Sequence, residues 1–83
     1  MDEVYNKIKV ICDGNFDYDK FCQLKKNLND SRINLDAFID LLCQGYSMNE
    51  AENKIVGLSK YAKQMSLSGC SYENALEALL RLA

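Results

Sequence analysis

The sequence has no histidine, proline or tryptophan, and it has only four glycines among its 83 residues. Without histidine the chain cannot form a Cys–His pair or a Ser–His–Asp triad, which excludes the commonest arrangements for nucleophilic and acid–base catalysis. The absence of proline and the scarcity of glycine leave few obligatory breaks in a helix. We therefore expect a non-catalytic, all-α protein that needs no cofactor.

Long apolar runs are lacking as well. No stretch has the length and apolar character of a signal peptide or a membrane span, so we expect a cytoplasmic protein without a membrane partner. The formal net charge of −2 does not favour binding of the whole chain to nucleic acid. Apolar residues make up 48% and charged residues 27%, which is ordinary for one globular domain spanning residues 1–83.

The cysteines show no metal-binding spacing. The chain has four of them, Cys12, Cys22, Cys43 and Cys70, and no CxxC pair. In a reducing compartment such residues behave as small apolar side chains. We expect buried thiols, with neither disulfides nor a zinc site.

The stretch 13–19, DGNFDYD, alternates oxygen-bearing side chains as the start of an EF-hand calcium loop does. The EF-hand pattern requires glycine at the sixth loop position and glutamate at the twelfth, where this chain has Tyr18 and Leu24. We therefore interpret the stretch as a turn that ends in a helix cap at Asp17, and we expect no metal.

The longest expected helix covers residues 47–66, and the other helices should pack against it. Its apolar residues recur at spacings of three and four, which places them on one helical stripe with Leu58 near the middle. The stripe consists of Met48, Ala51, Ile55, Leu58, Ala62 and Met65.

A local pattern predicts where four helices begin. In each copy an apolar residue precedes Asp, Asn or Ser, and a second apolar residue follows five positions after the first, as in a hydrophobic staple with an N-cap. The predicted caps are Asp17, Asn34, Ser47 and Ser71, and Glu50 completes a capping box with Ser47. The pattern predicts a compact bundle of four to five helices over residues 3–12, 17–28, 34–43, 47–66 and 71–82. Around the central stripe we expect an inward-facing set of Phe21, Leu24, Leu28, Leu35, Phe38, Ile39, Leu42, Tyr72, Ala75, Leu76, Leu79 and Leu82.

The segment 41–51, LLCQGYSMNEA, is followed by GLSK at 57–60. These residues resemble the LL-x-x-GYS-x-x-E and G-[LV]-S sequences common in bacterial helix-turn-helix DNA-binding domains. The resemblance implies a recognition helix from Ser59 to Ser66, whose Lys60, Tyr61, Lys63 and Gln64 would face phosphates and base edges. Against this, the apolar stripe stays in phase through Gly57, as it would in an unbroken helix.

A second resemblance involves residues 38–82. The Gln44-Gly45-Tyr46 loop and the Leu79-Leu80 pair are similar to the Gly-aromatic loop and C-terminal dileucine of ubiquitin-associated domains. That resemblance implies a three-helix module that binds ubiquitin. Gln44 replaces the methionine usual in that family, and the helix over 47–66 is about ten residues longer than its counterpart.

For function we expect protein–protein recognition: a regulator, adaptor or inhibitor that binds a larger protein, with helix-turn-helix DNA binding as the alternative. Tyr46, Lys60, Tyr61 and Lys63 form the first candidate binding face, because tyrosine and cationic side chains suit the anchors and rim of an interface. Reversing the charges of Lys60 and Lys63 should then reduce partner binding. Frequent Asn, Lys and Ile with rare Arg are typical of AT-rich genomes, so we expect a bacterial or phage protein. A protein of this size without catalytic groups would suit the role of blocking a host machine.

Asp13, Asp17 and Asp19 form a second candidate face. Their negative charge would suit a basic partner or imitate the charge of nucleic acid. The same three residues also fit a simpler role as the turn and first-turn acids of a helix. The oligomeric state does not follow from the sequence.

Overall fold

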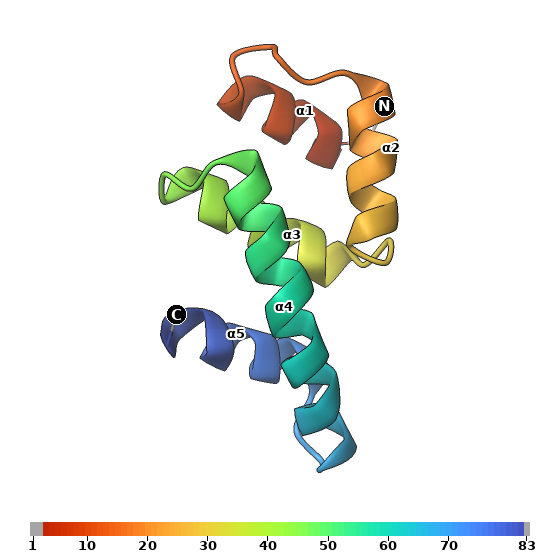
Figure 1. The fold of residues 1–83 in the computed structure, drawn as a ribbon, viewed down its shortest axis with the longest axis vertical. Helices are drawn as coiled ribbons and strands as arrows, with labels where there is room; N and C mark the ends of the chain where they lie inside the picture. The colour runs from red at the N-terminus through yellow and green to blue at the C-terminus, as the bar shows by residue number, and fades with distance from the viewer. Residues whose placement is uncertain (1–2, 83) are drawn as a thin grey trace.

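The computed structural model describes residues 3–82, and within that range the secondary structure consists of five α-helices (Figure 1). The helices are α1 (Glu3–Ile11), α2 (Tyr18–Asn27), α3 (Arg32–Cys43), α4 (Met48–Leu67) and α5 (Tyr72–Leu82). This confirms the prediction of an all-α bundle of four to five helices.

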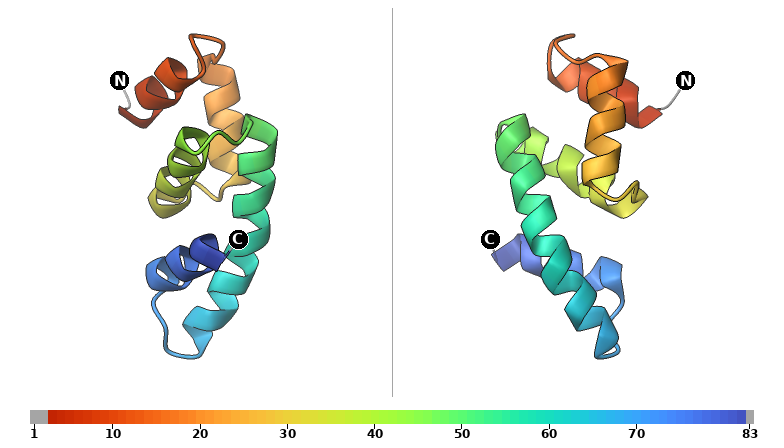
Figure 2. Two further views of the ribbon diagram at one scale, coloured as in Figure 1. Left: turned by 90° about the vertical axis from the view of Figure 1, so that its left-hand side faces the viewer. Right: turned by 45° about the vertical axis from the view of Figure 1, so that its right-hand side comes forward.

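Helix α4 is the organising element. With 20 residues it is the longest helix, and it contacts α2, α3 and α5, while α1 packs on α3. Figure 2 shows α1, α3 and α5 stacked on one side of α4, with α2 running beside its first half. The resulting molecule is elongated, with principal extents of 40 × 23 × 18 Å.

Three of the four predicted helix caps are confirmed. The Asp17 carboxylate accepts from the Lys20 backbone N–H at 2.8 Å, and the Ser71 hydroxyl accepts from the Asn74 N–H at 3.2 Å. Ser47 and Glu50 form the predicted capping box, with both reciprocal hydrogen bonds at 3.2 Å. These bonds satisfy N–H groups that have no partner within the first turn of a helix.

The prediction that Asn34 caps α3 is wrong. Ser31 is the N-cap, and its hydroxyl accepts from the Asn34 N–H, so α3 begins at Arg32. Asn34 lies in the first turn and is buried, because its amide bonds to other helices. Its Nδ2 donates to the Leu28 carbonyl at 3.0 Å, and its Oδ1 accepts from the Tyr72 hydroxyl at 2.5 Å.

Helix α4 continues unbroken through Gly57, as the apolar stripe predicted. The helix-turn-helix resemblance implied a separate recognition helix beginning at Ser59. That prediction is therefore wrong. Ser59 is buried in the middle of α4, and its hydroxyl donates to the Val56 carbonyl at 2.9 Å. A serine hydroxyl bonded within its own helix in this way does not cap a new one.

Gly57→Ala is expected to raise the free energy of unfolding by about 0.5–1 kcal/mol, because glycine is the weaker helix former. Apart from its chain neighbours and the backbone of its own helix turn, a Cβ at residue 57 would meet no atom within 4 Å, so no clash offsets the gain. Thermal and urea unfolding of the variant and the wild type would measure the change. A loss of stability would contradict a continuous, uncrowded helix at this position.

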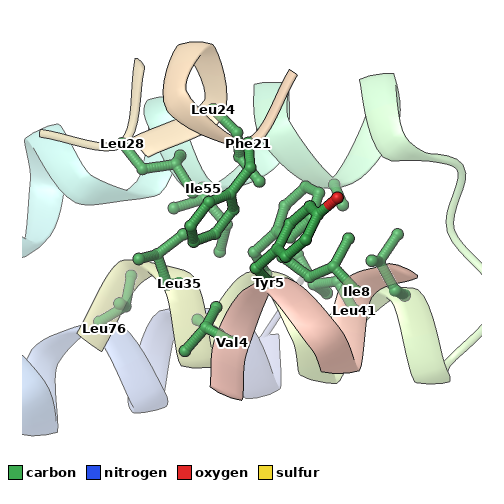
Figure 3. Close-up of a cluster of buried hydrophobic side chains, with 14 of the residues drawn as sticks. Val4, Tyr5, Ile8, Phe21, Leu24, Leu28, Leu35, Leu41, Ile55 and Leu76 are labelled. Carbon is green, nitrogen blue, oxygen red and sulfur yellow. The ribbon is translucent and has the colours of Figure 1, made fainter. Parts of the chain in front are cut away.

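The core contains buried side chains from all five helices (Figure 3). Ile55 of α4 lies among Phe21, Leu28 and Leu35 in this view, and its exposed fraction is 0%. The buried stripe of α4 is Ala51, Ile55, Ser59 and Ala62.

Seven predicted core positions are not fully buried in the structure. Five of them are half-buried and pack against the core: Ile39, Met48, Leu58, Tyr72 and Leu79. Leu58 is half-buried, because Ser59 takes the position that points most directly into the core. Met65 is exposed, since the last turns of α4 extend beyond the packed core. Leu82 is 85% exposed, because it lies in the last turn of α5, beyond that helix's buried Ala75 and Leu76.

The predicted burial of the cysteines is also wrong. Cys22, Cys43 and Cys70 are exposed, and Cys12 is half-buried. Cys22 lies between the inward-facing positions of α2, Cys43 ends α3, and Cys70 precedes the cap of α5. All four are free thiols, and burial raises the pKa of Cys12, with Asp13 adding to the rise.

Candidate protein-binding groove

A groove separates α3 from α5. The two helices lie on the same side of α4 and run in the same direction (Figures 1 and 2). Two adjoining hollows, of about 430 Å³ and 100 Å³, lie between them and share four lining residues, Ala37, Asp40, Glu77 and Leu80. We therefore treat them as one groove, the α3–α5 groove, lined by Ile33, Asp36, Ala37, Asp40, Leu41, Gln44, Glu73, Leu76, Glu77, Leu80 and Arg81.

The helical period explains which residues reach the groove. On α3 the lining residues recur at spacings of one, three and four, and the lining residues of α5 do the same, as one stripe of a helix requires. Position 37 of α3 lines the groove with position 77 of α5, and position 40 with position 80. One stripe of α3 and one stripe of α5 therefore line the groove together.

The floor of the groove is apolar. Ala37, Leu41 and Leu76 are buried, while Ile33 and Leu80 are half-buried and keep accessible apolar surface. A floor of this kind offers hydrophobic contact to a side chain that enters between the helices. It also means that the groove rests on the core, because Ala37, Leu41 and Leu76 belong to the main apolar cluster.

The rim of the groove is acidic on both sides. Asp36 and Asp40 lie one turn apart on α3, and Glu73 and Glu77 lie one turn apart on α5, all four exposed. Among the described residues that line the groove, Arg81 is the only cationic one. Asp36 pairs with Arg32 at 3.3 Å, but within residues 3–82 Asp40, Glu73 and Glu77 form no ion pair. The groove therefore presents several uncompensated carboxylates beside an apolar floor.

The residues of the first candidate face lie in two separate places, the second half of α4 and the loop before that helix. Lys60, Tyr61 and Lys63 are exposed on its second half, and Tyr61 and Lys63 point about 160° apart around the axis. Tyr46 precedes α4, is half-buried, and has the Lys54 Nζ 5.1 Å from its ring centroid. It is separated from Lys60 by about 20 Å of helix.

The second candidate face lies at the turn between α1 and α2. Asp13 has a positive φ of 55° in the turn, Asp17 caps α2, and Asp19 is in the first turn of α2. All three are exposed. Within residues 3–82 no three His, Cys, Asp or Glu side chains are placed to hold a metal ion.

The groove was missed from the sequence, although part of its signal is present there. Asp36 and Asp40, like Glu73 and Glu77, are acids four residues apart on predicted helices. What the sequence does not contain is the tertiary pairing that places these two rows opposite each other. Two of the residues that resemble features of ubiquitin-associated domains, Gln44 in the loop and Leu80 in the dileucine pair, line the groove. The other two, Tyr46 and Leu79, are half-buried outside it.

Comparison with family models, curated proteins and solved structures gave no match in any of the three cases. None of the five helices between residues 3 and 82 combines the length and apolar character needed to cross a membrane.

Proposed function

We propose that this protein is a non-catalytic interaction module that binds a larger protein through the α3–α5 groove and acts as a regulator, adaptor or inhibitor. The observation that carries the proposal is the combination of an apolar floor with two facing rows of carboxylates. Apolar floors supply the hydrophobic contact of an interface, and charged rims add specificity and speed association.

A cytoplasmic site of action belongs to the same proposal. Three exposed cysteines and one half-buried cysteine are all free thiols in the structure. Exposed thiols persist in a reducing compartment and are oxidised outside it.

The alternative, DNA binding through the second half of α4, has less support from the structure. Lys60 and Lys63 remain exposed and available to phosphates. The recognition helix that this alternative required does not begin at Ser59, however, and the groove adds a concentration of negative charge that repels phosphate.

Two double charge reversals test the proposal. Asp40→Arg/Glu77→Arg reverses the groove, and Lys60→Glu/Lys63→Glu reverses the exposed lysines of α4. Each immobilised variant and the wild type would be incubated with lysate from cells that carry the gene, and retained proteins would be identified by mass spectrometry. We expect a protein that the wild type and the lysine variant retain and that the groove variant loses. Circular dichroism would confirm that both variants fold.

The contrary outcomes are distinct. Loss of the partner only in the lysine variant would move the binding surface to α4 and contradict the groove. Fluorescence anisotropy with labelled duplex DNA at about 50 mM and 200 mM salt tests the alternative, since phosphate-driven binding weakens steeply over that range. Salt-sensitive DNA binding that is lost on reversing Lys60 and Lys63 would overturn the proposal.

A further inference from the structure

We infer that the occupant of the α3–α5 groove is a basic amphipathic helix of the partner protein. This inference rests on the proposed function, since it specifies the partner segment that the same groove would take. Three properties of the groove lead to it: its length, the charge of its rims, and the hydrogen-bonded backbone of its walls.

The length of the groove suits a short helix. Its lining on α3 extends from Ile33 to Gln44, which corresponds to about 16 Å along the helix axis. A helix of three turns has that length. Laid between α3 and α5, such a helix would place apolar residues recurring at three and four against the floor, where Ile33 and Leu80 keep accessible apolar surface.

The charge of the rims determines the flanks of that helix. Carboxylates lie on both sides, spaced one turn apart on each, and Asp40, Glu73 and Glu77 have no cationic partner within the described chain. Lysine or arginine residues on the flanks of a bound helix, also one turn apart, would meet them in register. An acidic segment would instead face like charges across the rim, which disfavours binding.

The backbone of the walls favours a helix over an extended peptide. Peptides that bind as strands rely on a row of unpaired backbone N–H and C=O groups at a sheet edge. The walls here are the sides of two α-helices, whose backbone groups are bonded within each helix. A helical segment satisfies its own backbone groups and contacts the groove through side chains alone.

Fluorescence anisotropy with a defined peptide tests the inference. The probe is a fluorescein-labelled 14-residue peptide of leucine and lysine, in which leucine recurs at three and four and so forms one apolar helical face. Two control peptides accompany it. One has the same composition with leucine at alternate positions, and the other has glutamate in place of lysine.

Matched protein variants separate the groove from the overall charge. Asp40→Asn/Glu77→Gln neutralises one carboxylate on each rim. Glu3→Gln/Glu52→Gln removes the same number of charges from residues that do not line the groove, so both variants have a formal net charge of −2 + 2 = 0. We expect the basic helical peptide to bind the wild type, the groove variant to weaken binding by about tenfold, and the control variant to change it by less than about twofold.

Each contrary result has a distinct meaning. Equal binding of the glutamate peptide would overturn the inferred charge, and equal binding of the alternating peptide would overturn the inferred helix; in both cases a protein-binding groove remains. Equal weakening by the two variants would mean attraction to the overall charge and would overturn the inference. Binding of none of the peptides would also overturn it, while the capture experiment, which uses no peptide, would still decide the proposed function.

Discussion

Replacing Phe21 by alanine is expected to lower the free energy of unfolding by about 4 kcal/mol. Phe21 is fully buried and connects α1 with α2 through ring contacts. Its ring centroid lies 5.4 Å from that of Tyr5, 6.2 Å from that of Phe16 and 6.0 Å from that of Tyr18. Removal of the ring would leave a cavity in the core and would also abolish these aromatic contacts.

Chemical denaturation monitored by circular dichroism would measure this loss. Tyr61→Ala is the matched control, because Tyr61 is also an aromatic residue in a helix but its side chain is 62% exposed. Loss of the Tyr61 side chain should change the free energy of unfolding by no more than about 0.5 kcal/mol. Since small domains are stable by only about 5–15 kcal/mol, we expect the Phe21 variant to unfold at a lower temperature than the wild type. A loss below about 1 kcal/mol would contradict the packed aromatic cluster.

Asn34→Ala is expected to lower the free energy of unfolding by about 2–3 kcal/mol. The Asn34 amide joins three helices, because it donates to the carbonyl of Leu28 at the end of α2 and accepts from the hydroxyl of Tyr72 on α5. Alanine removes both bonds and leaves the half-buried hydroxyl of Tyr72 without this acceptor. Asn53→Ala, an exposed change in α4, controls for the better helix propensity of alanine and should be neutral or slightly stabilising.

A double-mutant cycle with Tyr72→Phe isolates the bond between the two side chains. Burial raises the pKa of Tyr72 above its ordinary value of 10.0, against the opposing effect of its hydrogen bonds with Asn34 and Ser59. A raised pKa means that the neutral phenol favours the folded state, so this contribution is complete below pH 10 and is lost as the pH rises through the raised pKa. Additive effects of Asn34→Ala and Tyr72→Phe would contradict a direct bond.

Much of the fold could be predicted because its determinants are local. Asp17, Ser47 and Ser71 each cap a helix from within three residues, so a pattern in the sequence contains the whole interaction. The prediction that Asn34 caps α3 was wrong because two residues of this segment, Ser31 and Asn34, suit an N-cap. Ser31 takes that role, and the amide of Asn34 is used by Tyr72, which lies 38 residues away in the chain.

The residues of α4 that point into the core could be predicted from the sequence only to within about one position. Apolar character alone places Leu58 in the middle of the stripe, yet the structure buries Ser59 more deeply. A serine tolerates that position because its hydroxyl bonds to the Val56 carbonyl, an interaction that hydrophobic patterns do not record. The same limit applies to the groove, whose two rims are each visible as acids four residues apart, while their juxtaposition depends on how α3 and α5 pack on α4.

The distribution of burial along α4 implies that its local stability is graded. Ile55 and Ala62 are fully buried, whereas beyond Ala62 none of the residues of this helix is buried. Opening the last turns exposes little apolar surface and so costs little free energy, while opening the helix at Ile55 requires the domain to unfold as a whole. Helix α5 is anchored by Ala75 and Leu76 in the main core, so the tip of α4 can fray without widening the groove.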